Sequence, residues 1–475
     1  MSYRDLREFL DILEVEGQLV YYHDELLPEP DISAISCAAG ELESGPALLL
    51  DNIIGYKGKK VAVNVHGSWT NQALMLNMPK NSTIKEQFYE LTNRWDNYPG
   101  EVKWIKDAPC QEVVIDKDIN LYELLPLYKV NKYDGGFYFS KACVVTKDIT
   151  DMDNFDAQNV GTYRIQVQGP DTLALQTALF HDLGVHFQKA EQMNKPLPIA
   201  ICLGNDPMLT FIASTPIAYD QSEYKYAAAL KGTPMELVKC LTCDLDVSAY
   251  SEYVIEGEVI PGVRTVEGPF GEFPGSYSGV RKQLLIKVKK ITHRKDPIYE
   301  NLYIGKSWTE ADTLMALNTS VPLFKQLKET MPEIEAVNAF YQHGLTTIIS
   351  TDVRYGGFSK TVALKLASTP HGTAYCRNII VVDKDVDPFN LTQVMWALSC
   401  RVRDDKDIIV IPNCPGIALN PASEIPGIDR KLILDATTPV SPDKVMSDSK
   451  MIEKSEKVSE FSKLVSNLQN DLKKH

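Results

Sequence analysis

Strand-like runs and turn signals dominate the middle of this chain, from residue 111 to residue 305, and they restrict its fold class most strongly. Runs rich in β-branched and aromatic residues alternate with turns that contain Gly and Pro. The best-defined runs are Ala142–Thr146, Thr162–Gln168, Pro198–Leu203, Tyr253–Ile260 and Gln283–Thr292. Helical stretches near 182–193 and 222–240 interrupt the strands. The simplest interpretation is a β-rich middle domain, either a sheet or a barrel.

The segments on both sides of this middle domain mix helices with strands. Residues 1–110 predict an α+β region that begins with an amphipathic helix over 2–16. The middle domain spans 111–308, and a helix over 309–330 links it to residues 331–440, where alternating strands and helices indicate an α/β domain. Residues 441–475 predict a polar linker and a terminal helix. The apolar side of that helix must be buried, against the chain's own body or against a second subunit.

Composition and charge argue against several functional classes. The 475 residues carry a formal net charge of −14 and no Lys/Arg stripe, which disfavours nucleic acid as a partner. The longest apolar runs are strand-length, so we expect no membrane span, and the first residues show no signal region. The nine scattered cysteines are typical of reduced thiols in a cytoplasmic protein. Cys240 and Cys243 form a C-x-x-C motif without a second pair or a nearby His, which disfavours zinc there.

Two glutamates, Glu267 and Glu272, bracket a turn in which Gly268, Pro269 and Gly271 exclude a regular helix. Carboxyl groups placed among glycines and aromatic rings lose hydration. That loss favours the neutral form and suits a general acid near neutral pH. The alternative is an ordinary surface turn with two solvated glutamates.

Arg164 is predicted on a strand of the β-rich core, after the turn-favouring Asn159 and Gly161. A guanidinium keeps its charge and offers a planar fork of donors, so in such a core it needs a carboxylate or phosphate partner. Glu267 and Glu272 are candidates for that partner. An arginine that bridges both can hold one carboxylate ionised while the other carries a proton.

A candidate metal site consists of the imidazole of His181, the carboxylate of Glu223 and the amide of Asn159. This oxygen-rich set suits Mn²⁺ or Mg²⁺ better than Zn²⁺. The alternative is a core histidine beside an N-cap and a surface glutamate. Lys360 follows a Gly-rich turn that opens a helix, so this segment is either an anion cradle or a plain helix entry.

These motifs, taken in order, resemble the UbiD family of decarboxylases. They are Asn159-x-Gly161-x-Tyr163-Arg164, His181 before a helix, Ser222-Glu223-Tyr224, and the turn from Glu267 to Glu272. The resemblance covers nearly the whole chain and is strongest to the large subunits of reversible, non-oxidative phenolic acid decarboxylases. It implies a split β-barrel of flavin-reductase type in the middle and a C-terminal α/β oligomerisation domain. It also implies a homodimer or homohexamer in which the terminal helix packs across subunits.

The resemblance further implies a cofactor, prenylated FMN, with Mn²⁺ and K⁺ at its phosphate. By position, the cofactor contacts are Asn159, Thr162, Tyr163, Arg164, His181, Glu223 and Lys360. Asn159, His181 and Glu223 match the metal ligands, and Ser214 matches part of the potassium site. Arg164, Glu267 and Glu272 match the catalytic triad, with Glu272 as the proton donor.

The activity implied is reversible decarboxylation of 4-hydroxybenzoate, protocatechuate, vanillate or gallate to the phenol and CO₂. Loss of CO₂ leaves a carbanion in the ring plane that no side chain stabilises, so a cofactor must accept the electrons. The expected partners are the aromatic acid, a flavin prenyltransferase that supplies the cofactor, and small companion subunits. The alternatives are a related decarboxylase of a prenylated hydroxybenzoate or a cinnamate, a flavin-dependent oxidoreductase, and a non-catalytic scaffold.

Overall fold

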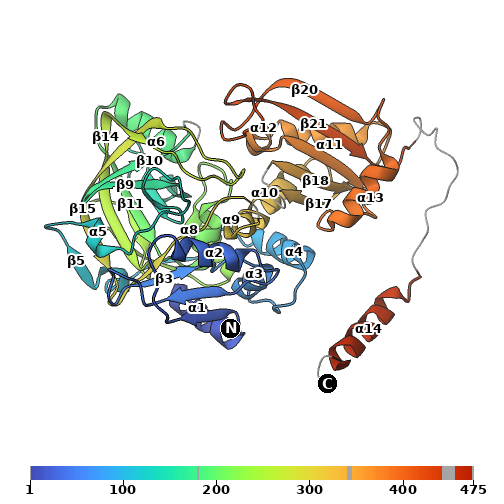
Figure 1. The fold of residues 1–475 in the computed structure, drawn as a ribbon. Coiled ribbons are helices and arrows are strands. Elements are labelled where there is room, and N and C mark those ends of the chain that lie inside the picture. The colour runs from blue at the N-terminus through green and yellow to red at the C-terminus, as the bar shows by residue number, and fades with distance from the viewer. Residues whose placement is uncertain (1, 179–180, 307, 340–344, 441–454, 473–475) are drawn as a thin grey trace.

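A computed structural model of the protein describes residues 2–178, 181–306, 308–339, 345–440 and 455–472. Figure 1 shows a large curled sheet with the N-terminal helices beneath it, a separate C-terminal sheet, and a last helix that stands apart. The expected multidomain α+β architecture is confirmed.

The N-terminal region is built on a four-stranded mixed sheet of order β1-β2-β3-β16. Its strands are β1 (Leu19–Tyr22), β2 (Ala47–Leu50), β3 (Lys60–Val63) and β16 (Ile298–Glu300). Its helices are α1 (Leu6–Val15), α2 (Asp31–Gly40), α3 (Trp69–Met75) and α4 (Ile84–Trp95). The Asp5 carboxylate caps α1 by accepting the Glu8 N–H at 2.9 Å. Because β16 lies far along the chain, this sheet fastens the end of the middle segment to the N-terminal region.

The middle segment forms a nine-stranded sheet of order β6-β9-β10-β15-β14-β11-β7-β8, with β5 paired to β15. The strands are β5 (Val113–Ile115), β6 (Phe137–Phe139), β7 (Cys143–Lys147), β8 (Gln158–Thr162), β9 (Ile165–Gly169), β10 (Thr172–Leu175), β11 (Leu197–Leu203), β14 (Tyr253–Glu267) and β15 (Arg281–His293). The helices beside it are α5 (Leu121–Leu124) and α6 (Asp182–Gln192). A buried hydrophobic cluster fills the curl; it includes Ile165, Leu173, Ile201 and Ile286.

The order of β8 and β9 shows how this sheet curls. β8 is the last strand at one end, whereas β9 is second from the other end, and only Tyr163 and Arg164 separate them in sequence. The two edges must therefore approach each other, which gives a barrel split where these two residues cross. The predicted continuous strand over Thr162–Gln168 is wrong, because the chain leaves one edge at Thr162 and joins the other at Ile165.

A small sheet of order β13-β12-β4 covers one side of the barrel, together with two helices. These elements are β4 (Val102–Trp104), β12 (Met235–Lys239), β13 (Asp246–Ser248), α7 (Pro207–Ala213) and α8 (Glu223–Lys231). The predicted helix over 222–240 is too long. It ends because Gly232 adopts a left-handed conformation, with φ of 74°, and Pro234 follows it.

Two helices, α9 (Glu310–Leu314) and α10 (Leu317–Lys328), replace the single linking helix expected over 309–330. Phe88 of α4 packs with ring centroids 5.3 Å from both Phe324 of α10 and Phe389 of the C-terminal segment. The linking helix α10 is thus buried between the N-terminal and C-terminal parts.

The C-terminal domain is a five-stranded sheet of order β17-β18-β19-β21-β20, parallel in the middle and antiparallel at both edges. Its strands are β17 (Ile334–Ala339), β18 (Thr346–Thr351), β19 (Asn378–Asp383), β20 (Ile408–Pro415) and β21 (Ile428–Ala436). Its helices are α11 (Phe358–Ala367), α12 (Pro370–Tyr375) and α13 (Leu391–Arg401). The predicted β/α alternation is confirmed.

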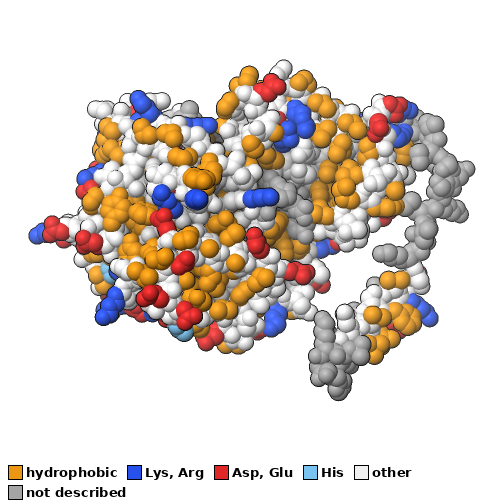
Figure 2. Space-filling model, viewed as in Figure 1, with side chains coloured by type: hydrophobic (Ala, Val, Ile, Leu, Met, Phe, Trp, Pro, Cys, Tyr) orange, Lys and Arg blue, Asp and Glu red, His pale blue; other side chains and the backbone are white. Residues whose placement is uncertain are grey.

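The terminal helix α14 (Val458–Leu472) is separate from the rest of the protein in Figure 1. The predicted linker before it lies outside the described residues. Five apolar side chains of α14 are 44–60% exposed: Val458, Phe461, Leu464, Val465 and Leu468. Figure 2 shows hydrophobic side chains gathered on this helix. Among the helices in the described ranges, none combines the length and apolar character needed to cross a bilayer.

Candidate active site

Arg164 lies at the split of the barrel and contacts both glutamates of the Gly/Pro turn. Its Nε and Nη2 donate to Glu267 Oε1 and Oε2 at 3.0 and 2.9 Å, and its Nη1 contacts Glu272 Oε1. The side chains of Arg164, Glu267 and Glu272 are only 8, 0 and 9% exposed. A surface turn with two solvated glutamates is therefore wrong. The three groups form a buried carboxylate–guanidinium–carboxylate array.

The backbone of the turn holds the two glutamates in place. Glu267 is the last residue of β14, and Gly268 then takes a φ of 98°, a conformation that favours glycine. At Gly271 a Cβ atom would lie 2.4 Å from Asn131 Nδ2, so a larger residue would displace the Asn131 side chain. Asp134 Oδ1 accepts the Gly271 N–H at 2.8 Å, and the Gly135 N–H donates to Pro269 O at 2.7 Å. The segment around Asp134 thus clamps the turn.

Aromatic rings exclude water from one side of the array. The Arg164 Cζ lies 5.6 Å from the centroid of the Phe270 ring, within cation–π range. The Phe270 ring in turn lies 4.5 Å from the Tyr138 ring. Burial, followed by the nearby Glu267 carboxylate, raises the pKa of Tyr138 far above its usual range, so this phenol stays neutral.

The environment of Glu272 gives it the properties of a proton carrier near neutral pH. Burial raises the pKa of Glu272 to about 7, although the Arg164 guanidinium opposes the shift. The Glu267 and Asp134 carboxylates add to the increase by repulsion. Burial also raises the pKa of Asp134 to about 6. One array therefore holds an arginine beside a carboxyl group that exchanges its proton in the physiological range.

The second set of predicted residues, Asn159, His181 and Glu223, comes from β8 and from the starts of α6 and α8. Asn159 lies on β8, His181 directly precedes α6, and Glu223 begins α8. The Val160 N–H donates to Glu223 Oε2 at 3.1 Å, which joins α8 to β8. The Tyr163 ring lies against Gly161, and its centroid is 6.0 Å from that of His181. Burial, then the charges of Asp182 and Glu223, raise the pKa of Tyr163.

The chemistry of Glu223 and Asn159 in this second set fits a bound cation and an anion. Burial raises the pKa of Glu223 to about 8, and among the described residues no lysine or arginine pairs with it. Asn159 Nδ2 is buried, and within the described residues no acceptor lies in good hydrogen-bond geometry with it. A divalent cation would compensate the carboxylate, and a phosphate oxygen would accept from the amide. The donor set therefore fits a metal-bound phosphate.

The remaining predicted residues are divided between two places. Ser214 Oγ donates to Thr162 Oγ1 at 3.1 Å, so the end of α7 lies against the end of β8. Lys360 lies on α11, and its Nζ donates to Lys406 O at 2.9 Å within the C-terminal domain. The contacts found within the described ranges join Lys360 to neither the Arg164 array nor the Asn159 set.

The sequence did not identify the clamp provided by Asp134 or the ring of Tyr138. Asp134 precedes two glycines, a common turn signal, and nothing local in the sequence indicates that it contacts a turn more than a hundred residues away. Tyr375 of α12 was also missed. Burial, and then the charge of Glu272, raises the pKa of Tyr375.

A split barrel that holds a buried array of one arginine and two glutamates defines a class, an acid–base enzyme. The chain belongs to the UbiD family of decarboxylases. Family models match residues 10–91, 102–307 and 312–436. They describe the N-terminal, Rift-related and C-terminal domains of 3-octaprenyl-4-hydroxybenzoate carboxy-lyase. The predicted membership of this carboxy-lyase family is confirmed.

Curated and solved proteins agree with this assignment. The chain is 58% identical over 446 residues to "Phenolic acid decarboxylase" of Sedimentibacter hydroxybenzoicus, covering 93% of both chains. It is similar, with a TM-score of 0.92 and 55% identity over 99% of both chains, to the vanillic acid decarboxylase (ShVdcCD) of that organism in closed form. It is also similar to an evolved dimeric form of the UbiD-class enzyme HmfF from Pelotomaculum thermopropionicum in complex with prFMN. That match has a TM-score of 0.82 and 26% identity, and covers 96% of this chain and 98% of the other.

Proposed function

We propose that this protein catalyses the reversible, non-oxidative decarboxylation of a hydroxybenzoic acid to the phenol and CO₂ with prenylated FMN. The name of the relative at 58% identity supports the substrate class, and the prFMN complex of a structural neighbour supports the cofactor. The structural observation that carries the proposal is Arg164 bridging the buried Glu267 and Glu272.

The cofactor, when bound, supplies an electron sink for the bond between the ring and the departing carboxylate. We assign Asn159, His181 and Glu223 to a Mn²⁺ ion that would hold the cofactor phosphate, because Glu223 is a buried carboxylate with no lysine or arginine beside it in the described ranges and Asn159 Nδ2 is buried. Thr162 and Tyr163 line the same end of β8, and Ser214 contributes to a K⁺ site there. Lys360 completes the set from the C-terminal domain.

Arg164, Glu267 and Glu272 have different roles in the proposed reaction. Glu267 holds Arg164 through two hydrogen bonds, which fixes the direction of the guanidinium. Arg164 orients the substrate carboxylate and keeps positive charge beside it. Glu272 carries a proton at its carboxyl oxygen and delivers it to the ring carbon after CO₂ has left. Burial of all three side chains excludes water as a competing proton source.

A pKa of about 7 suits a reversible reaction. Decarboxylation needs protonated Glu272, whereas carboxylation needs the ionised form to remove the proton from the ring. Near neutral pH both forms are populated, so the same residue serves both directions. A hydroxyl group para to the carboxyl group enriches the ring in electrons and favours bonding to an electrophilic cofactor.

We also propose the partners that this chemistry requires. A flavin prenyltransferase supplies the cofactor, and a small companion subunit accompanies the chain, as the two-part name of the vanillic acid decarboxylase suggests. The exposed apolar face of α14 supports packing against another copy in a homodimer or homohexamer. We place the protein in the cytoplasm.

The test is co-expression with a flavin prenyltransferase, followed by the absorption spectrum and intact mass of the bound cofactor. CO₂ release is then measured from 4-hydroxybenzoate, protocatechuate, vanillate and gallate. Prenylated FMN with CO₂ release supports the proposal. Turnover of prenylated hydroxybenzoates or cinnamates alone would replace the substrate class. Bleaching of bound flavin by NAD(P)H without CO₂ release would indicate an oxidoreductase.

A further inference from the structure

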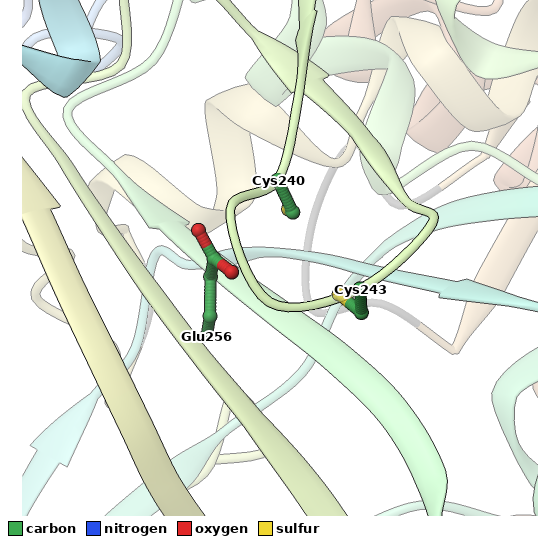
Figure 3. Close-up of side chains that lie close together, drawn as sticks. All are labelled: Cys240, Cys243 and Glu256. Atoms are coloured by element: carbon green, nitrogen blue, oxygen red, sulfur yellow. The ribbon is translucent and has the colours of Figure 1, made fainter. Parts of the chain in front are cut away.

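Three side chains near the start of β14 lie close together, whereas the candidate active site begins where that strand ends. They are Cys240 and Cys243, from the connection between β12 and β13, and Glu256 from β14 (Figure 3). Two sulfurs and one carboxylate oxygen, one atom from each residue, lie within 4.8 Å of one another. The sequence offered only the two cysteines, because the third group comes from a different strand.

The C-x-x-C turn is wrapped around the Glu256 carboxylate. The Leu241 N–H donates to Glu256 Oε1 at 2.9 Å. The Thr242 N–H and hydroxyl donate to Oε2 at 2.7 and 2.6 Å. A carboxylate accepts about four hydrogen bonds, so one lone pair, on Oε1, remains for another partner. The backbone thus fixes the carboxylate beside the turn that carries the two cysteines.

Among the described residues, Glu256 has no ion-pair partner. Its side chain is fully buried. Lys290 faces it across the strand pair, but no lysine or arginine nitrogen in the described ranges lies within 4.0 Å of it. The other cluster of possible metal ligands, His66, Glu300 and Glu310, differs in this respect. There the Lys141 Nζ contacts both carboxylates at 2.5 and 2.6 Å, so an internal cation already fills the cluster.

We propose that Cys240, Cys243 and Glu256 bind a thiophilic divalent cation, Zn²⁺, with water in the fourth position. Tetrahedral zinc has ligands at about 2.0–2.3 Å, which places ligand atoms about 3.3–3.8 Å apart. The ligand atoms, now within 4.8 Å of one another, therefore need to move by only about 1 Å to coordinate one ion. Two thiolates select zinc over the harder Mn²⁺. The partly exposed Cys243 provides an entry path from solvent.

The bound ion would fasten the connection between β12 and β13 to β14. Because it binds the folded chain and needs all three ligands in place, it stabilises the native state by an amount that grows with the logarithm of its free concentration above Kd. This role is independent of decarboxylation, so its test does not depend on the proposed function.

The test uses the full chain, reduced and stripped with a chelator, and titrates Co²⁺ alone. One Co²⁺ per chain is expected to give a near-ultraviolet thiolate-to-cobalt band that added Zn²⁺ removes. Co²⁺ bound by Asn159, His181 and Glu223 gives no such band, since that set has no sulfur. We expect Cys240→Ser and Cys243→Ser to lose the band, and Glu256→Gln to weaken binding about tenfold or more. Cys400→Ser, at an exposed thiol, is the control and keeps it.

A second measurement needs no variant. Zn²⁺ is expected to slow alkylation of Cys240 and Cys243 in the wild-type protein and to leave Cys400 unchanged, as peptide mapping would show. A reduced wild-type protein with no thiolate band at saturating Co²⁺, or with equal labelling rates with and without Zn²⁺, overturns the proposal.

Discussion

Arg164 and Glu267 are joined by two hydrogen bonds of 3.0 and 2.9 Å, although 103 residues separate them in the chain. The pair closes the split of the barrel, because Arg164 lies between β8 and β9 while Glu267 ends β14. The contact therefore serves the fold and the site together. It also leaves the third guanidinium nitrogen, Nη1, for Glu272.

Removal of Arg164 alone should destabilise the protein more than removal of the pair. Arg164→Ala leaves the fully buried Glu267 without a cation, at an expected cost of about 3–5 kcal/mol in the free energy of unfolding. The double variant with Glu267→Gln should recover part of that loss. Chemical denaturation measures all three proteins. The control is Arg281→Ala, an exposed arginine opposite Glu267 in the strand register, with an expected change within about 0.5 kcal/mol. Equal stability of the single and double variants would contradict this account.

Glu272→Gln should keep the cofactor and lose the reaction. Because the amide cannot donate a proton to carbon, we expect kcat to fall about 10²-fold or more and hydrogen–deuterium exchange on the ring to stop. The cofactor spectrum should not change. Glu258→Gln, at a carboxylate on the same strand that pairs with Lys289, is the matched control and should retain full activity. Turnover that survives in Glu272→Gln would assign the proton to another group.

The pH dependence of decarboxylation should follow Glu272. Its pKa of about 7 predicts that kcat declines as pH rises through 7, because the proton donor ionises. Asp134→Asn removes a nearby negative charge that raises this pKa, so the decline should begin at a lower pH. Initial rates between pH 5.5 and 9 at saturating substrate measure both profiles. If kcat declines at the same pH in Asp134→Asn as in the wild type, a group other than Glu272 controls the decline.

Local patterns in the sequence predicted most of the helices and strands, but not where the chain crosses from one sheet edge to the other. The helix near 182–193 and the strands Pro198–Leu203 and Gln283–Thr292 were recognisable because hydrophobic periodicity and turn signals act within a few positions. The break between β8 and β9 was not, because Tyr163 and Arg164 suit a strand by composition. These two residues lie outside both strands because they connect opposite edges of the sheet, and that arrangement depends on the whole barrel.

The candidate site shows the same limit. The identities of Arg164, Glu267 and Glu272 were accessible, because a charged fork and two carboxylates beside Gly/Pro turns are unusual in a β-rich segment. Their mutual contacts, the clamp from Asp134 and the third ligand Glu256 beside the C-x-x-C motif were not, since each depends on strands that are distant in sequence. Lys360 remains a prediction from position alone.

Removal of the proposed metal should release the cofactor. Glu223→Gln removes the only carboxylate of the Asn159–His181–Glu223 set, so we expect weaker Mn²⁺ binding by about tenfold or more and partial loss of flavin absorbance. Electron paramagnetic resonance of free Mn²⁺ in a titration measures the affinity. Glu191→Gln on α6, where the carboxylate pairs with Arg264 at the surface, is the control. If Glu223→Gln binds Mn²⁺ as the wild type does, the ligand set is wrong.

The apolar face of α14 should determine the oligomeric state. Phe461 and Leu468 are 52 and 56% exposed, and a helix with such a face gains stability only when a partner covers it. Phe461→Asp with Leu468→Asp places charges on that face, so the mass measured by light scattering should fall towards that of a single chain. Ser462→Asp with Ser466→Asp adds the same charge at polar positions of the helix and should leave the mass unchanged. An unaltered mass in the Phe461/Leu468 variant would show that subunits associate through another surface.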